Sequence, residues 1–185
     1  PGMQTGRIIA DILFGKVNPS GRLSVSIPRE PGQNPVYYNY YPGQHGDGYA
    51  DLKTQGALYP FGFGLSYTEY SYKDLKLDTD EIDPEGTAVL SLEIENTGDM
   101  DGEETVQLYI NDKVSSRTTP VKELKGFKKI FIAAGESVPV SFKINRSNLP
   151  PVNSVLEPGL FELMAGPNSC DNVLLKTELL VKEKS

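Results

Sequence analysis

The chain has 185 residues and a mass of 20.3 kDa, the size of one domain or of one domain with an additional fragment. Its 18 basic and 25 acidic side chains give a net charge of −7 at pH 7, which argues against binding to nucleic-acid phosphates. No apolar run approaches the length of about 20 residues that crosses a bilayer. We therefore expect neither a nucleic acid nor a membrane as a partner. The single Cys170 excludes an internal disulfide.

The first predicted element is a short helix at residues 4–14. Its apolar residues recur at helical spacing and form one stripe, made of Ile8, Ile9, Ile12 and Leu13. Gly15 follows at the position where a helix end favours a left-handed residue. Nothing nearby in the sequence is suited to cover this stripe, so we expect it to contact another polypeptide segment or a second copy of the chain.

A turn with the sequence Asn-Pro-Ser-Gly occupies residues 18–21 and separates the helix from a predicted strand. Leu23, Val25 and Ile27 alternate with polar residues, which is the pattern of a half-buried strand. Pro28 ends this pattern because it lacks the backbone N–H that a strand ladder needs.

Residues 29–55 show no periodicity and are rich in proline, glycine and tyrosine. Such a long irregular segment is usually functional or connects domains. Disordered linkers are poor in aromatic residues, so the tyrosines predict that this connector lies ordered against a surface. Two interpretations remain open: the aromatic side chains contact a ligand such as a sugar, or they only pack the connector onto its neighbour.

From Tyr67 onward the sequence alternates between apolar and polar residues. The pattern predicts about seven strands, at residues 70–77, 88–94, 106–110, 130–132, 138–144, 160–165 and 173–181. The 130–132 and 138–144 segments flank an Ala-Ala-Gly-Glu turn, which predicts a hairpin. Seven short strands at this spacing favour a β-sandwich of the immunoglobulin or fibronectin type III class.

Patterns of catalysis and cofactor binding are missing from the sequence. His45 is the only histidine that could serve a Ser-His-Asp triad, and no G-x-S-x-G elbow is present. Gly62-Phe63-Gly64 begins a dinucleotide fingerprint but lacks its third glycine, and there is no Walker loop. The aspartates near Gly86 and Gly102 do not match the spacing of a calcium loop. We therefore expect no metal and no cofactor.

Several segments, read in order, resemble glycoside hydrolase family 3, the β-glucosidase and β-xylosidase family. They are GRIIADILFGKVNPSGRLSVSIP at 6–28, PVYYN at 35–39, LYPFGFGLSYTEYSY at 58–72, ENTGDMDGEETVQLYI at 95–110, KELKGFKKI at 122–130 and LEPGLFELMAG at 156–166. The resemblance implies three parts. Residues 1–28 would be the end of an α/β sandwich domain, residues 29–66 a connector, and residues 67–185 a fibronectin type III-like domain.

The resemblance also implies what the chain does not contain. In this family the aspartate nucleophile lies on a barrel domain, and the acid/base glutamate usually lies on the α/β domain, in both cases upstream of these residues. No residue here matches either motif, so we expect no catalytic residue. The chain would be a scaffold portion of a retaining enzyme that hydrolyses terminal β-D-glucosyl or related residues. His45, Asp47 and Tyr49 in the connector are the candidates for the rim of its substrate pocket.

Two other functions remain open from the sequence. The chain is a stand-alone carbohydrate-binding module if its sandwich holds polysaccharide alone, although such platforms usually expose tryptophan and the chain has none. It is a structural fibronectin-type module if it derives from a multidomain surface protein, although the leading helix and turn argue against this. Both a cytoplasmic and a secreted location are compatible with the sequence.

Overall fold

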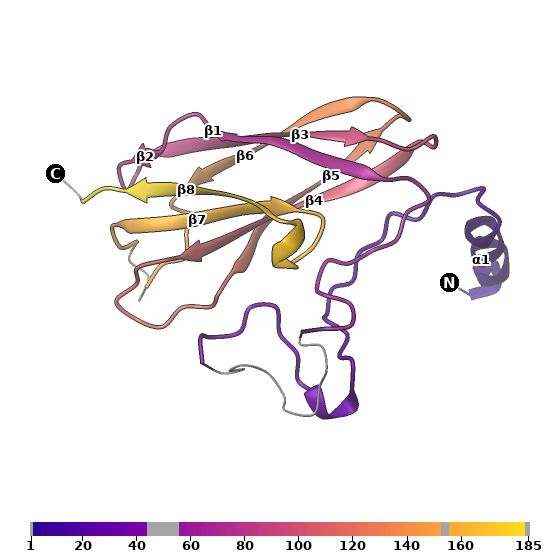
Figure 1. Ribbon diagram of the computed structural model, residues 1–185, viewed down its shortest axis with the longest axis horizontal. Coiled ribbons are helices and arrows are strands. Elements are labelled where there is room, and N and C mark those ends of the chain that lie inside the picture. The colour runs from indigo at the N-terminus through magenta and orange to yellow at the C-terminus, as the bar shows by residue number, and fades with distance from the viewer. Residues whose placement is uncertain (1, 44–55, 153–155, 184–185) are drawn as a thin grey trace.

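The computed structural model describes residues 2–43, 56–152 and 156–183. Two β-sheets face each other, and a single α-helix, α1 (Thr5–Leu13), stands away from them at the N-terminal end (Figure 1). The strands are β1 (Tyr70–Leu77), β2 (Glu81–Ile82), β3 (Thr87–Asn96), β4 (Gly102–Asp112), β5 (Glu123–Ile132), β6 (Ser137–Asn145), β7 (Gly159–Gly166) and β8 (Leu175–Val181). Short 3-10 turns occupy Gly2–Gln4, Pro31–Gln33 and Asp171–Val173.

The two sheets confirm the predicted sandwich. One sheet has three strands in the order β1-β3-β6, and the other has five in the order β2-β8-β7-β4-β5. Every pairing is antiparallel except that of the short β2 with β8. The sequence pattern missed β2, which has only two residues, and placed the start of the last strand two residues before Leu175.

The predicted hairpin at residues 130–144 is wrong. β5 pairs with β4 in the five-stranded sheet, whereas β6 pairs with β3 in the three-stranded sheet. The intervening turn therefore crosses between the layers, and it bonds to the end of β3: Asn96 N–H donates to the Glu136 carbonyl at 2.9 Å, and Gly135 N–H donates to the Asn96 carbonyl at 3.0 Å. Gly135 has φ +74°, a value that suits both a hairpin turn and a turn that crosses between sheets. The local sequence therefore did not distinguish a hairpin from a crossing.

The strand predicted at residues 22–28 forms only an isolated bridge between Ile27 and Tyr59. This segment does run beside residues 58–63, and Leu23 exchanges backbone hydrogen bonds with Gly62 and Phe63 at 2.8 Å. Pro60 interrupts the ladder because it has no N–H to donate. Residues 22–28 therefore pair with a neighbouring segment, as the alternation predicted. Pro60 in that segment prevents the two from forming a continuous pair of strands.

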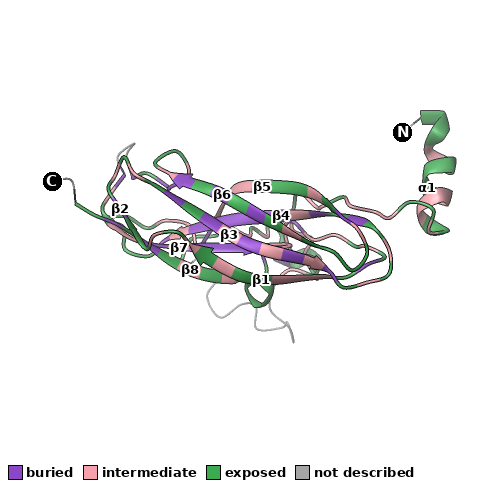
Figure 2. Cartoon of the chain, turned by 90° about the horizontal axis from the view of Figure 1, so that it is seen from above, coloured by how far each residue is buried: buried purple, intermediate pink, exposed green. Residues whose placement is uncertain are grey.

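The core lies between the sheets and is filled from alternating positions of the strands (Figure 2). Its largest fully buried apolar side chains include Leu90, Ile94, Leu108, Ile110, Phe161 and Leu163. Burying each such side chain contributes about 1.5–3 kcal/mol of transfer free energy. The sandwich thus closes its own apolar core.

The α1 helix differs from the sandwich because none of its nine residues is buried. It ends where predicted: Phe14 N–H donates to the Ala10 carbonyl at 2.9 Å, and Gly15 has φ +72°. None of the helices in the described ranges combines the length and hydrophobicity needed to cross a bilayer.

Candidate functional site: the junction between the N-terminal segment and the sandwich

The Asn-Pro-Ser-Gly turn brings Asn18 against two separate parts of the sandwich. Asn18 Nδ2 donates to the Asp101 carbonyl at 3.1 Å. Its Oδ1 accepts from both the Ser66 hydroxyl and the Tyr67 N–H at 2.9 Å. One amide side chain therefore links the N-terminal turn to the segment before β1 and to the turn before β4.

Ser20, two residues after Asn18, makes the next contact with the sandwich. Its hydroxyl donates to Glu103 Oε2 at 3.1 Å, and Lys129 Nζ lies 2.6 Å from the same oxygen. The Lys129 ammonium and the Ser20 hydroxyl lower the pKa of Glu103 because both stabilise its charged form. A carboxylate on β4 is thereby shared between β5 and the N-terminal turn.

Arg22 makes the most buried contact of the junction. Its guanidinium pairs with the Glu104 carboxylate, and the two side chains are only 13% and 1% exposed. Tyr72 donates its hydroxyl to Glu104 Oε1 at 2.7 Å. Burial first, and then the neighbouring Glu104 charge, raise the pKa of Tyr72, so it remains a neutral donor.

The position of Glu104 in β4 explains why this pair is buried. In β4 the even-numbered positions, which include Val106 and Leu108, face the core between the sheets. Glu104 occupies the same face near the start of the strand, so the strand directs a carboxylate inward at one end of the sandwich. A buried carboxylate needs a paired cation, and Arg22 supplies it from 82 residues away.

Two glycines permit this close approach. A Cβ on Gly64 would overlap the Arg22 guanidinium and the Gly21 carbonyl oxygen, and a Cβ on Gly102 would overlap the Tyr70 hydroxyl. These glycines are therefore required by packing, since neither has a positive φ.

The connector packs against the outer face of the five-stranded sheet. The ring of Tyr38 stacks on Phe61 with a centroid distance of 4.3 Å and meets Tyr109 edge-on at 5.7 Å. Gln107 fixes the adjoining backbone, since its Nε2 donates to the carbonyls of Gly62 at 3.2 Å and Pro167 at 2.6 Å. This part of the connector therefore lies ordered against a surface, as predicted, and Tyr38 packs on the neighbouring aromatic rings.

The predicted substrate-rim residues His45, Asp47 and Tyr49 lie outside the described residues. Their role stays a prediction. Within the described ranges, no group of three or more His, Cys, Asp or Glu side chains could hold a metal ion. Cys170 is a free, exposed thiol.

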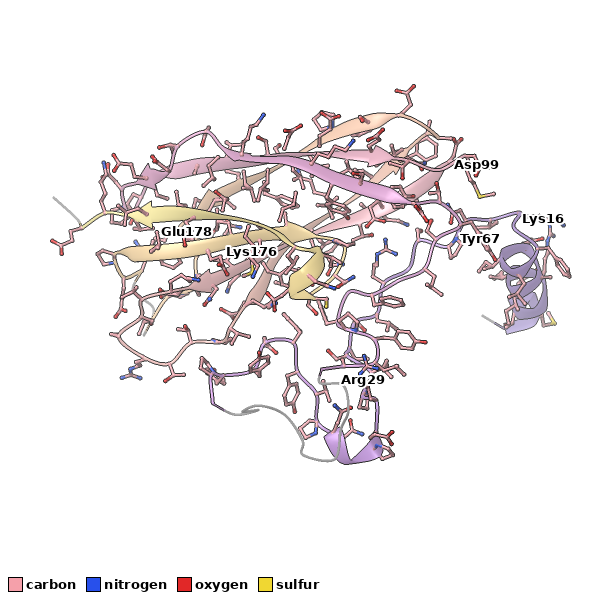
Figure 3. The ribbon with its side chains drawn as sticks, viewed as in Figure 1. Lys16, Arg29, Tyr67, Asp99, Lys176 and Glu178 are labelled. Carbon is pink, nitrogen blue, oxygen red and sulfur yellow. The ribbon has the colours of Figure 1, made fainter. Side chains whose placement is uncertain are left out.

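The apolar stripe of α1 faces solvent. Ile8 and Ile9 are each 49% exposed and Leu13 is 70% exposed, whereas Ile12 is half-buried. The Tyr67 hydroxyl donates to the Ile12 carbonyl at 2.8 Å and so ties the last turn of the helix to the segment before β1 (Figure 3).

Sequence reasoning did not find the Arg22–Glu104 pair, although one signal was present. Glu104 lies two positions before Val106, in step with the apolar residues Val106, Leu108 and Ile110. A charged residue on a core face implies a buried partner. The sequence could not say which of the 18 basic residues was that partner.

Comparisons with known proteins identify the two halves of this junction. The family model of the Glycosyl hydrolase family 3 C-terminal domain matches residues 1–67, and that of the Fibronectin type III-like domain matches residues 104–169. The chain belongs to glycosyl hydrolase family 3 and corresponds to the C-terminal region of its members. The predicted resemblance is thus confirmed.

Individual relatives agree with this assignment. The chain is 41% identical to a β-xylosidase of Formosa agariphila, with 98% of the chain and 26% of that protein covered. It is 40% identical to the periplasmic β-glucosidase of Salmonella typhimurium, with 91% of the chain and 24% of that protein covered. A β-glucosidase structure from Erythrobacter marinus matches with a TM-score of 0.90 and 38% identity, over 96% of this chain and 24% of that one. The chain therefore spans about a quarter of the length of the relatives it matches.

Proposed function

We propose that this chain is the non-catalytic C-terminal support of a retaining β-glycosidase that removes terminal β-D-glucosyl or related residues. In this proposal residues 1–28 end an α/β sandwich domain, residues 29–66 connect, and residues 67–185 form the fibronectin type III-like domain. The catalytic nucleophile and acid/base belong to the remainder of the parent enzyme. The observation that carries the proposal is the partly buried junction between the two family domains.

The junction supports a bracing role because its contacts are directional and partly buried. Asn18, Ser20 and Arg22 each reach a different point of the sandwich through a hydrogen bond or an ion pair. Removing one partner of a buried ion pair leaves an uncompensated charge, which costs about 3–5 kcal/mol. Such a junction holds the end of one domain in a fixed orientation to the next.

The exposed stripe of α1 supports a partner outside these residues. A helix with no buried residue gains little from packing, and an isolated helix of nine residues is marginal in water. We propose that Ile8, Ile9, Ile12 and Leu13 contact the rest of the parent enzyme, and a second copy of the chain is the alternative partner. His45, Asp47 and Tyr49 are proposed to lie at the rim of the substrate pocket.

Activity measurements test the proposal directly. The 185-residue chain is expected to release no nitrophenol from aryl β-glucosides or aryl β-xylosides. Turnover by this chain that a single Asp or Glu substitution within it abolishes would contradict the proposal.

The parent enzyme provides the complementary test. Deleting the sandwich is expected to lower both its activity and its thermal unfolding temperature, because the α/β domain loses its brace. Arg22→Ala in the intact enzyme is expected to act in the same direction with a smaller effect. Unchanged activity and an unchanged unfolding temperature after deletion would exclude a supporting role.

A further inference from the structure

Two phenylalanines face outward from β5, an edge strand of the five-stranded sheet. Phe127 is 66% exposed and Phe131 is 60% exposed. They lie on one face of the strand because successive side chains alternate between its two faces, and the adjacent Ile132 points the other way into the core. Figure 2 shows β5 largely in the colours of intermediate and exposed residues. Large apolar side chains on an exposed edge strand are a surface that proteins normally cover.

This surface is continuous with the junction. Lys129 lies between the two phenylalanines on the same face, and its Nζ is 2.6 Å from Glu103 Oε2, the oxygen that accepts from the Ser20 hydroxyl. Phe131 is the register partner of Glu103 in the pairing of β4 with β5. The outer β5 face, made of Phe127, Lys129 and Phe131, therefore begins where the N-terminal turn already touches the sandwich.

The size and charge of the outer β5 face argue against a second copy of the chain as its partner. Two phenylalanines exposed to this degree offer roughly 200–300 Å² of apolar area, whereas a stable complex of separate proteins buries about 800 Å² on each side. A symmetric contact would also press the same face against itself. It would bring the lysines of both copies, at positions 125, 128 and 129, close together.

A partner on the same polypeptide is not subject to this limit. A tethered surface is present at a high effective concentration, so a small patch is enough to hold it. The chain covers 26% and 24% of the lengths of two of its relatives. In the proposed function, the rest of the parent polypeptide includes the larger part of the α/β domain that α1 helps to complete. The α1 helix stands beyond the end of the sandwich at which β4 begins, tied there by the Tyr67 hydroxyl (Figure 1).

We propose that the outer β5 face docks against the upstream part of the parent enzyme, through an apolar surface of that part. The inference rests on the proposed function and deepens it, because it names a second contact by which the sandwich is held. The stripe of α1 and the outer β5 face would then contact the same upstream part from two sides of the junction.

Hydroxyl-radical footprinting of the intact enzyme and of the 185-residue chain tests this inference, because oxidation of a side chain reports its access to water. Oxidation of Phe127 and Phe131 should be at least about fivefold lower in the intact enzyme, since the centre of a docked surface excludes water. Leu180 is the control, because it is 42% exposed near the opposite end of the same sheet. Its oxidation should be equal in the two proteins.

A pair of substitutions provides a second measurement. Phe127→Thr combined with Phe131→Thr keeps the β propensity of the strand but removes the apolar surface. It should lower the thermal unfolding temperature of the intact enzyme by at least about 3 °C and that of the 185-residue chain by no more than about 2 °C. Leu180→Thr is the matched control and should leave the intact enzyme unchanged.

Three results would overturn the proposal. They are equal oxidation of the two phenylalanines in both proteins, protection in the 185-residue chain that grows with its concentration, and equal losses of unfolding temperature in both proteins. The second of these would identify another copy as the partner. If deletion of the sandwich impairs the enzyme but the phenylalanines are not protected, only the docking surface is wrong. If the phenylalanines are protected but deletion has no effect, the supporting role is wrong and the docking surface stands.

Discussion

The sandwich and the N-terminal segment are stabilised in different ways. The sandwich buries alternating side chains of eight strands between its own two sheets. The N-terminal segment contributes no buried residue from α1 and is held by individual polar contacts, of which Arg22–Glu104 is the most buried. One region therefore has an apolar core of its own, and the other takes its position from its neighbours. The difference indicates where substitutions will act on stability and where they will act on association.

The largest effect is expected inside the sandwich. Phe161 is fully buried in β7, and Phe161→Ala should lower the free energy of unfolding by about 4 kcal/mol because it leaves a cavity in the core. Phe127, which is 66% exposed on β5, provides the matched control. Phe127→Ala should change stability by less than about 1 kcal/mol. Urea denaturation of both variants measures the contrast, and equal effects would contradict the assignment of the core.

The next effect is expected at the junction. Arg22→Ala should cost about 3 kcal/mol, because among the described side chains Glu104 is left buried with Tyr72 as its one remaining donor. The exposed pair of Arg146 and Glu85 is the control, and Arg146→Ala should cost no more than about 1 kcal/mol. A double-mutant cycle with Glu104→Gln separates the coupling from the loss of packing. A coupling near zero would show that the two groups act independently.

The stabilising contribution of the junction is also expected to decrease in acid. The pKa of Glu103 is lowered in the folded chain by Lys129 and Ser20. A carboxylate with a lowered folded pKa stabilises the fold above its unfolded pKa, and this contribution is lost as the pH falls through the folded pKa. Stability should therefore decrease in the acid range, and Glu103→Gln should flatten this part of the profile. Urea midpoints measured across the acid range provide the test, and an identical profile for the variant would refute it.

The smallest effect on stability is expected from the exposed stripe. Ile9→Ser should change the free energy of unfolding by less than about 0.5 kcal/mol, since Ile9 is 49% exposed on a helix that has no buried residue. The same substitution should reduce self-association of the chain if the stripe is its contact surface. Light scattering of the two proteins at several concentrations gives the answer. A strictly monomeric unchanged chain would leave the parent enzyme as the partner of the helix.

The sequence predicted the elements of this fold better than their pairing. Alternation located β3, β4, β6 and β7 because the period of two depends only on which face is buried. The crossing of the turn at Gly135 could not be predicted, since the hydrogen bonds that distinguish it come from Asn96, far away in the chain. The junction was hidden for the same reason: Asn18 and Ser20 belong to a predicted turn and Arg22 to the predicted strand after it, whereas their partners lie 48 to 83 residues further along the chain.

The Arg22–Glu104 contact also has a consequence for folding. Its two partners are 82 residues apart, and Glu104 lies in the part of β4 that pairs with β5, opposite Ile130. Closing so long a loop is entropically unfavourable until the distant strand offers its full set of contacts. The N-terminal turn is thus expected to take its final position late in folding, after β4 has paired with β5.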